Sequence, residues 1–578
     1  MKTSSLIPCL LALAGLLAAR LASSSANLVV TNLADSGPGT LRSALTNAAS
    51  GAVITFDPSL SGATNILTNG ELLIPTNLTI DASALPGGFN ISGNQSLRVF
   101  ELAANTVVTV NSLTIQHGNI VGNGGGILLN SGASLALANC TLSGNSATNA
   151  GALQGNGGGI YVNPGASLTL TNCTVSGNSA NVSGEIGLNS GGGGICFFGD
   201  TLTISGSTFT NNSVLDPNNA ASYVSGGGIC FFGDALRVNG STFYSNSVSS
   251  DYMAGGGGIY LYGGTLTLTN CTLSGNFVAN SGVVGPGGGG ICLDGASTAT
   301  ITGSMFSGNS ASADTGGGIS GWQGALTING STFSGNSAGG SYSYGGGGIY
   351  LYRDTLTLNN STFSGNQAIA GGGGIWVQNG PYYAELLINN STFSGNSGGG
   401  ILFGGNVFYL TNTIVAGNTP GDISGGSFGA NNLTNGNPLL APLGNYGGPT
   451  QTMPPLPGSP AIGAGSVAAN AFSTDQRGYP RTQNGLIDIG AVELQSPAAN
   501  PPVLENITMP AGGGNGLQFT FTNAPAADFT VLTATNVSLA LTNWTVLGEV
   551  QQVAPGRYQF TDPQAATNRA RFYRVRSP

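Results

Sequence analysis

The stretch IYLYGGTLTLTNCTLSGN, residues 259–276, decides the local structure because its apolar residues recur with a period of two. Ile259 and Leu261 alternate with tyrosines, and Leu266 and Leu268 alternate with threonines. Such alternation predicts β-strands with one buried face, and the Gly-Gly and Ser-Gly-Asn steps predict the turns between them. The stretch therefore predicts three short strands rather than a helix.

Related phrases recur ten times along the chain. An isoleucine after a glycine run begins each repeat, and an asparagine closes a phrase such as Thr-Phe-Ser-Gly-Asn. The isoleucines are Ile127, Ile160, Ile195, Ile229, Ile259, Ile291, Ile319, Ile349, Ile375 and Ile401. The asparagines are Asn145, Asn178, Asn212, Asn246, Asn276, Asn309, Asn336, Asn366, Asn396 and Asn418. The two positions lie 17 or 18 residues apart in nine repeats and 21 apart in one, whereas successive isoleucines lie 26 to 35 residues apart. A constant segment joined by variable loops is typical of a solenoid.

The repeats predict an all-β fold. A coil of three short strands cannot bury its apolar face alone, whereas parallel stacking of coils buries that face and pairs the backbone groups of neighbouring coils. Crossovers between parallel strands are right-handed. We therefore expect a right-handed parallel β-helix of about ten recognisable coils, with an N-terminal cap and a small C-terminal β-sandwich.

The composition narrows the function classes. Charged residues make up 6% of the 578 residues, the net charge is −9, and Lys2 is the one lysine. This shortage of cations predicts no nucleic-acid partner and no electrostatic attraction of the chain as a whole to an anionic membrane. The sequence has no Cys-x-x-Cys pair and a single histidine, His117, so it predicts no zinc site and no cofactor.

The first 26 residues have the pattern of an export signal. Lys2 precedes the apolar run 6–19, and small residues lead to Ala26. No later run of about 18 apolar residues follows, so we expect no membrane span once the signal is removed. We expect an exported protein, extracellular or at the cell surface.

Five further segments are expected. They are a capping segment with the first coils (27–118), the repeats (119–420), the end of the β-helix (421–495), a linker (496–502) and an immunoglobulin-like or fibronectin-like β-sandwich (503–578). In the capping segment, the phrase DSGPGTLRSAL predicts a short helix with Thr40 as its N-cap and Leu41, Ala44 and Leu45 facing inward. Such a helix would cover the open edge of the first coil.

The Gly-Gly-Gly-Ile and Phe-x-x-Asn phrases resemble the repeats of the polymorphic outer-membrane protein family, over residues 119–418. The second phrase occurs at Phe209 and Asn212, Phe243 and Asn246, Phe306 and Asn309, Phe333 and Asn336, Phe363 and Asn366, and Phe393 and Asn396. The resemblance implies an exported bacterial β-helix associated with the outer membrane.

Residues 437–494 are similar to the choice-of-anchor Q domain, which follows β-helices in exported bacterial proteins. The similarity rests on the sequences NPLLAPLGNYGG and TDQRGYPR. This segment concentrates charge in a chain that is otherwise poor in it. The charged residues are Asp475, Arg477, Arg481, Asp488 and Glu493. A buried ion-pair network is the main interpretation, and a binding site is the alternative.

The C-terminal segment is locally basic. Its arginines are Arg557, Arg569, Arg571, Arg574 and Arg576. One interpretation is solubility and protection of strand edges. The other is a module for sorting or surface docking.

Six cysteines follow the export signal. Cys196, Cys230 and Cys292 share a column of equivalent positions with tyrosines, and Cys140, Cys173 and Cys271 share another with serines. We expect unbridged thiols, because side chains in register on neighbouring parallel strands suit a disulfide poorly. Bridges Cys140–Cys173 and Cys196–Cys230 are the alternative, since each pair lies on adjacent coils.

Catalysis on a polysaccharide would need paired carboxylates, or calcium with a basic residue. Asp200 and Asp234 share a column on adjacent coils and form the one weak calcium candidate in the repeats. Gly-Asp is also an ordinary turn pair, so we expect turn residues here and assign no catalytic residue.

One column, three residues after the isoleucine, is rich in aromatic residues. It holds Phe198, Phe232, Tyr262, Asp294, Trp322 and Tyr352, beside a second column with Tyr161, Tyr260, Tyr350 and Trp376. Alternation predicts that both columns face outward. Mutual stacking of the rings, or cover by the variable loops, is the main interpretation. Binding of carbohydrate or a protein partner by an outward aromatic row is the alternative.

These observations predict a structural or adhesin-like surface β-helix that is not an enzyme and that binds through its aromatic face or its loops. The alternative is a pectate-lyase-like enzyme, a lyase or hydrolase that degrades a polysaccharide.

Overall fold

The structure is a computed structural model. It describes residues 27–149, 155–182, 190–216, 224–250, 254–280, 287–312, 316–339, 345–369, 371–378, 384–426, 428–483, 485–495, 503–508, 516–523, 529–539, 543–554, 557–565 and 571–576. The expected export signal, the linker 496–502 and Arg569 lie outside these ranges. The chain divides into two compact units, Met1–Thr300 with Phe306–Ala325 and Asn336–Leu351, and Ile301–Met305 with Leu326–Gly335 and Tyr352–Pro578.

Each typical coil contains four strands. In one coil these are β20 (Ile195–Phe197), β21 (Thr201–Ser205), β22 (Thr208–Thr210) and β23 (Ser213–Asp216). The prediction of three strands was wrong because the fourth strand begins directly after the Ser-Gly-Asn turn. This strand is short, two residues in β41 (Ser337–Ala338) and four in β23, and the sequence pattern assigned its residues to a variable loop.

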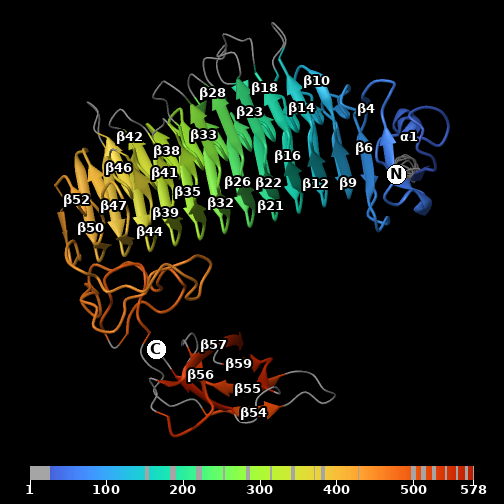
Figure 1. Ribbon diagram of the computed structural model, residues 1–578. Helices are drawn as coiled ribbons and strands as arrows, with labels where there is room; N and C mark the ends of the chain where they lie inside the picture. The colour runs from blue at the N-terminus through green and yellow to red at the C-terminus, as the bar shows by residue number, and fades with distance from the viewer. Residues whose placement is uncertain are drawn as a thin grey trace, which may run out of the picture. The chain divides into compact units, whose positions relative to one another are not determined.

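Equivalent strands of successive coils pair in parallel (Figure 1). Within the described residues, sheet A has 15 strands, from β1 (Asn27–Val30) to β53 (Phe428–Ala430). Sheets B and C have 13 each, from β3 (Thr64–Ile66) to β51 (Ile414–Val415) and from β4 (Leu72–Ile74) to β52 (Ile423–Ser424). Sheet D has nine, from β10 (Asn119–Val121) to β45 (Gln367–Ala368). The parallel β-solenoid has about 11 turns, which confirms the predicted fold.

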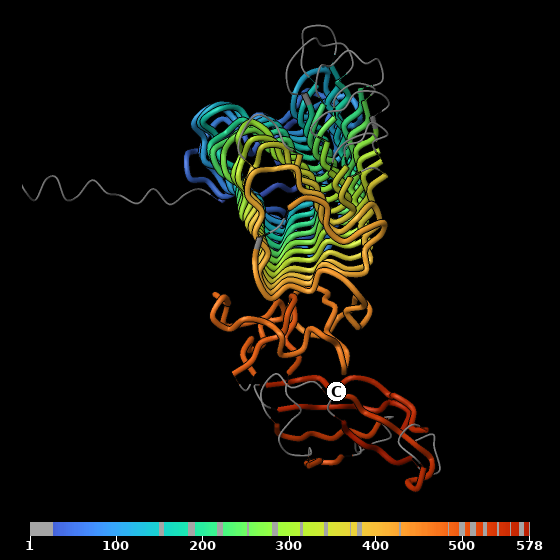
Figure 2. Tube along the Cα trace, turned by 90° about the vertical axis from the view of Figure 1, so that its left-hand side faces the viewer, coloured from blue at the N-terminus to red at the C-terminus, as the bar shows by residue number. Residues whose placement is uncertain are grey.

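The apolar residues of the alternating pattern fill the interior of the coils. Figure 2 shows the coils coloured blue to green lying over one another. Strand register places equivalent residues of neighbouring coils side by side. Phe209 and Phe243, for example, stack with ring centroids 4.7 Å apart and are both fully buried. Each fully buried Leu, Ile or Phe contributes about 1.5–3 kcal/mol relative to an exposed one, so these columns contribute much of the stability of the coils.

The asparagine that closes each repeat forms an internal amide ladder. Asn212 donates a hydrogen bond from Nδ2 to Oδ1 of Asn246 on the next coil, over 2.8 Å, and another to the carbonyl oxygen of Val175 on the preceding coil, over 2.9 Å. The ladder runs through Asn145, Asn178, Asn212, Asn246, Asn276, Asn309 and Asn336, and through Asn366, Asn396 and Asn418. It ends at Asp422, whose carboxylate accepts from Asn418 over 2.9 Å. These bonds satisfy polar groups that would otherwise be costly to bury.

The glycine run before each isoleucine allows backbones to touch. A Cβ atom on Gly193 would lie 2.5 Å from both the amide nitrogen and the carbonyl oxygen of Ser213, and 2.6 Å from the carbonyl oxygen of Gly227. Glycine is therefore required where the returning chain crosses the first residue of a sheet D strand.

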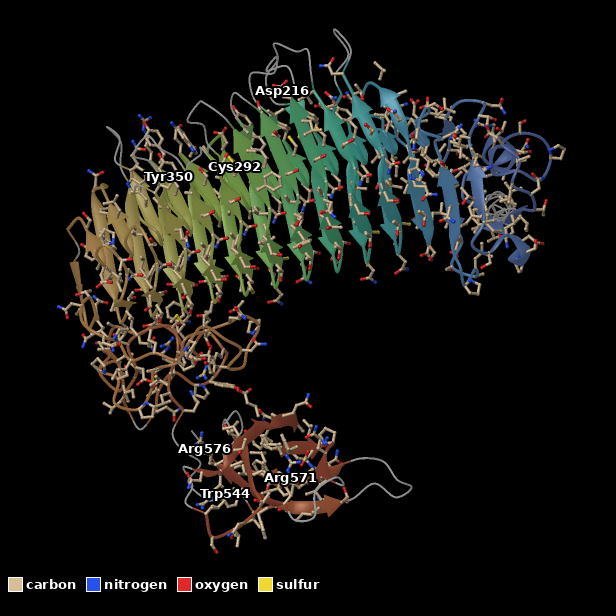
Figure 3. The ribbon with its side chains drawn as sticks, viewed as in Figure 1. Asp216, Cys292, Tyr350, Trp544, Arg571 and Arg576 are labelled. Carbon is tan, nitrogen blue, oxygen red and sulfur yellow. The ribbon has the colours of Figure 1, made fainter. Side chains whose placement is uncertain are left out.

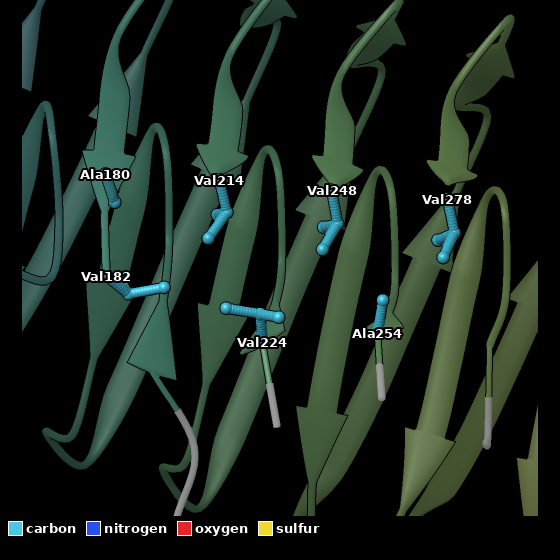
Figure 4. Close-up of a cluster of buried hydrophobic side chains, with 7 residues drawn as sticks. All are labelled: Ala180, Val182, Val214, Val224, Val248, Ala254 and Val278. Carbon is cyan, nitrogen blue, oxygen red and sulfur yellow. The ribbon is translucent and has the colours of Figure 1, made fainter. Parts of the chain in front are cut away.

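Sheet D has its own apolar seam. After the loop, the chain returns through β19 (Ser190–Gly191), β24 (Val224–Ser225) and β29 (Ala254–Gly255), which form a three-stranded sheet. Figure 4 shows side chains of sheet D pointing toward the returning strands. The seam consists of Ala180, Val182, Val214, Val224, Val248, Ala254 and Val278, all buried. The coil thus carries a second β-layer beside its main core.

The N-terminal helix is confirmed. α1 (Leu41–Asn47) has Thr40 as its N-cap, whose side-chain oxygen accepts from the amide of Ser43 over 3.1 Å. Its inward residues are Leu41, Ala44 and Leu45, as predicted.

After the last coil, residues 437–495 run along sheet B of the second unit. Gln476 donates to Thr332 Oγ1 over 2.8 Å and accepts from Thr362 Oγ1 over 2.6 Å. Arg481 donates from Nη2 to Oδ1 of Asn360 over 2.7 Å. Side-chain hydrogen bonds to Thr332, Thr362 and Asn360 therefore hold this segment against the last coils.

The C-terminal domain is a small antiparallel sandwich, as the sequence predicts. One sheet contains β54 (Glu505–Thr508), β55 (Leu517–Thr522), β59 (Arg557–Asp562) and β58 (Gln551–Ala554). The other contains β57 (Thr545–Glu549), β56 (Thr530–Ala534) and β60 (Phe572–Arg576). Its core is Phe519, Phe521, Phe529, Val531 and Tyr558.

Candidate functional site

The column directly after the isoleucine is buried, which fits the interpretation of a covered row rather than that of an open binding row. Tyr260 is 0% exposed, Tyr350 1% and Trp376 7%. Tyr161, Cys196, Cys230, Tyr260 and Cys292 form one cluster, and Cys292 and Tyr350 are labelled in Figure 3. The returning strands reach this side of sheet C, where Ser225 Oγ of β24 lies 3.2 Å from Cys230 Sγ. Burial raises the pKa of the Tyr260 hydroxyl far above its usual value.

The neighbouring aromatic column is only partly covered. Phe198 and Phe232 stack with centroids 4.7 Å apart and planes 5° apart, so each ring covers a face of the other. The Tyr262 ring follows at 5.8 Å from Phe232, tilted by 43°, and is 46% exposed. The row therefore ends in one accessible aromatic side chain, at the end of β30 (Ile259–Tyr262).

A fixed carboxylate lies on the coil after Tyr262. Strand register pairs Tyr262 with Asp294. Asp294 Oδ2 accepts from the buried Tyr260 hydroxyl over 3.1 Å, and Oδ1 accepts from the amide of Gly295 over 2.7 Å. The absence of a side chain at Gly295 leaves room for the Tyr262 ring, since a Cβ there would lie 3.1 Å from it. An exposed ring and an oriented hydrogen-bond acceptor are thus held side by side.

The other two aromatic residues of the column are half-buried. Trp322, in β38 (Ile319–Trp322), lies with its ring centroid 6.3 Å from that of Tyr350. Tyr352, at the end of β42 (Ile349–Tyr352), has the Arg353 guanidinium 4.5 Å above its ring. Each packs against a neighbour from the same compact unit, which supports the stacking interpretation for these positions.

Asp200 and Asp234 are exposed turn residues. Their backbones join the ladder, since the amide of Asp234 donates to the carbonyl oxygen of Asp200 over 3.0 Å. Among the described residues, no group of three or more His, Cys, Asp or Glu side chains is arranged to hold a metal ion.

The six cysteines of the two columns are unbridged thiols, and all are buried. Cys140 and Cys173 take the place of serine in a hydrogen-bonded column. Ser207 donates its hydroxyl to the carbonyl oxygen of Ser205, and Cys173 Sγ contacts the equivalent oxygen of Thr171 at 3.3 Å. Cysteine here is a small, buried replacement for serine.

The charged residues of 437–495 form a buried network. Arg477 pairs with Asp475 over 2.9 Å, and the amide of Asp488 donates to Glu493 Oε2 over 2.7 Å. Burial raises the pKa of Glu493 to about 8, and it raises that of Asp488 as well. The network holds the segment together, in line with the main interpretation of these residues.

A carboxyl pair near the N-terminus was missed by the sequence reasoning. Arg98 contacts Glu71 and lies 3.5 Å from Glu101, which also accepts from Asn130 Nδ2 over 2.8 Å. Burial and the adjacent Glu101 raise the pKa of Glu71. Burial alone would raise the pKa of Glu101, but hydrogen bonds from Glu71 and Asn130 outweigh burial, and the pKa of Glu101 is lowered. Glu71 and Glu101 are 30 residues apart, which is the length of one coil, and this spacing could have indicated that they lie close together. It was not noticed because the repeat phrases that align the coils begin later in the chain.

The comparisons agree with this architecture. The family described as "Right handed beta helix region" matches residues 87–355 and 227–419, together more than half of the chain. The chain belongs to this family. The match supports the predicted right-handed coil. No curated protein matches the chain, and no solved structure matches it. In the described part of the chain, no helix has the length and apolar character needed to cross a membrane.

Proposed function

We propose that this β-helix is an exported, non-catalytic scaffold of the cell surface or extracellular space, which binds carbohydrate at Tyr262. The observation that supports it is the pairing of the 46% exposed Tyr262 ring with the fixed carboxylate of Asp294 on the next coil. Aromatic rings pack against the apolar faces of sugars, and an adjacent acceptor orients sugar hydroxyls.

The proposed binding residues lie on regular, stacked coils, as expected of a rigid scaffold protein. The coil ladders set the relative positions of Phe232, Tyr262 and Asp294 within a rigid sheet. Rigid placement lowers the ordering cost of binding. The resemblance of the repeats to outer-membrane surface proteins, and the export pattern of the first 26 residues, support the proposed location.

A carbohydrate array, combined with assays for reducing sugars and unsaturated products, tests this function. Tyr262→Ala should weaken binding about tenfold, the upper range for an aromatic contact. Tyr244→Ala is the matched control, because Tyr244 is 52% exposed on sheet B and should leave binding unchanged. Trp322→Ala and Tyr352→Ala should have smaller effects, since both rings are half-buried.

Two outcomes would contradict the proposal. Full binding by Tyr262→Ala would show that this face is not the site. Cleavage of any polymer by the wild-type chain would replace the scaffold with the polysaccharide-degrading alternative. Cell fractionation tests export separately.

A further inference from the structure

The arginines of the C-terminal domain are segregated from the rest of the chain. Residues 27–502 contain six arginines and eighteen acidic residues, whereas residues 557–576 contain five arginines and one acidic residue. The low overall cation content therefore hides a locally basic stretch of sequence. An inference drawn from this stretch does not depend on binding at Tyr262.

β60 presents a row of three exposed side chains. Tyr573 and Val575 pack against the sandwich core, so Phe572, Arg574 and Arg576 face the other side. Alternate residues of a strand lie about 7 Å apart, which spaces the three side chains evenly along the edge. β60 is the outer strand of the sheet β57-β56-β60, so nothing in the described sandwich flanks it.

The neighbouring residues of this face are covered. Register places Arg574 beside Leu532 and Phe572 beside Ala534, and these two residues of β56 are only 2% and 8% exposed. Phe572 itself is 38% exposed. The accessible part of the face is thus the Phe572, Arg574 and Arg576 row rather than a broad apolar patch.

The two outer arginines differ from Arg571 in their partners. Arg571 pairs with Asp562 over 3.0 Å and donates to Thr533. No ion pair within the described residues involves Arg574 or Arg576, and both side chains are exposed. Figure 3 labels Arg571 and Arg576 in this domain. Arg571 has a structural role, and the other two guanidinium groups are available to a ligand.

From this row we infer that β60 binds a linear, carboxylate-bearing polysaccharide. Guanidinium groups match carboxylates in bidentate geometry, and the Phe572 ring packs on a sugar face. A narrow linear row fits an extended polymer better than a broad lipid surface, which would require a wider apolar area. Residues 27–502 are net negative, so they repel an anionic polymer and disfavour its binding outside the C-terminal domain.

Affinity electrophoresis of the full chain in polygalacturonate, with dextran as the neutral polymer, tests this. The double variant Arg574→Ser/Arg576→Ser should lose about tenfold in affinity, as expected for two exposed charge pairs. Arg557→Ser is the matched control, because Arg557 is exposed on β59 of the other sheet. Arg574→Lys/Arg576→Lys keeps the charge and should give an intermediate loss. Phe572→Ser should also weaken binding, and Tyr262→Ala should not.

Equal retardation by dextran would overturn the inference, as would an equal loss in Arg557→Ser. Binding to anionic phospholipid vesicles with none to polygalacturonate would overturn it in favour of a lipid surface. Unfolding midpoints of the variants should equal that of the wild type, since neither Arg574 nor Arg576 contributes to the core.

Discussion

The side-chain amide of Asn212 donates to the side-chain oxygen of Asn246 over 2.8 Å, and both side chains are fully buried. The bond joins two coils inside the solenoid, 34 residues apart in sequence. It shows that the asparagine of the repeat phrase is a structural residue rather than an ordinary turn residue.

Asn212→Ala should lower the free energy of unfolding by about 2–3 kcal/mol. The change leaves the carbonyl oxygen of Val175 and the amide of Asn178 without their partner, and each unsatisfied buried group costs about 1–3 kcal/mol. Urea unfolding measures the effect. Thr210→Ala, a half-buried position in the same coil, is the control and should cost less than 1 kcal/mol. Equal costs for the two variants would contradict the role of the ladder.

Gly193→Ala should lower the free energy of unfolding by about 3 kcal/mol, since the added methyl group meets backbone atoms of Ser213 that cannot move independently. Gly421→Ala is the control, because nothing lies within 4 Å of a Cβ there. Limited proteolysis and urea unfolding measure both variants. A wild-type unfolding curve for Gly193→Ala would show that the glycine run has no packing role.

The thiols of the six column cysteines should react with a maleimide only after denaturation, because all six are buried. Mass spectrometry of the alkylated protein counts the labelled sites. Cys271→Ser should change the free energy of unfolding by less than about 1 kcal/mol, because serine occupies the equivalent position on the adjacent coil. A disulfide found at Cys140–Cys173 or Cys196–Cys230 in the native protein would contradict this prediction.

Docking of residues 437–495 should weaken as the pH rises from about 4.5 to about 8. Glu493 has a pKa of about 8 when folded and an ordinary value of 4.5. The folded state therefore binds a proton that the unfolded state releases in this range. The resulting stability is fully present below about pH 4.5 and is lost as the pH approaches 8. Hydrogen exchange of residues 463–494 at several pH values measures the slope of local stability against pH.

Glu493→Gln should reduce that slope because the amide does not titrate. Asp488, whose pKa is also raised, keeps a smaller dependence of the same sign. An unchanged slope in Glu493→Gln would assign the pH dependence to other groups.

Much of the fold was predictable from local pattern. The period of two at Leu266 and Leu268 defines strands, and the constant Ile-to-Asn distance defines a coil, because stacked coils must keep equivalent residues in register. The helix after Thr40 followed from its N-cap. The fourth strand was not predictable, because residues such as Ser337 and Ala338 have weak strand preference and pair only once the coils stack.

The candidate site was predicted less well. Alternation indicated the side of sheet C on which Tyr260 and Tyr262 lie, but it could not show that a second β-layer buries Tyr260 and leaves Tyr262 exposed. That difference depends on where the chain returns after each loop. Glu71 and Glu101 were missed for a related reason, because their coils lack the repeat phrases that align the others.

The amide ladder also gives the solenoid a direction and a terminus. Within the two runs Asn145–Asn336 and Asn366–Asn418, each asparagine donates a side-chain hydrogen bond to the asparagine of the following coil. A coil could therefore be duplicated or removed between two of these asparagines without reversing any bond. Asp422 is different, since its carboxylate accepts from Asn418 and has no hydrogen to pass on. Strand register places Asp422 opposite Gly400, directly before the isoleucine of the next strand, so the last asparagine is bonded by a carboxylate from outside the asparagine column. The series of amide-to-amide hydrogen bonds stops there, independently of how many repeats precede it.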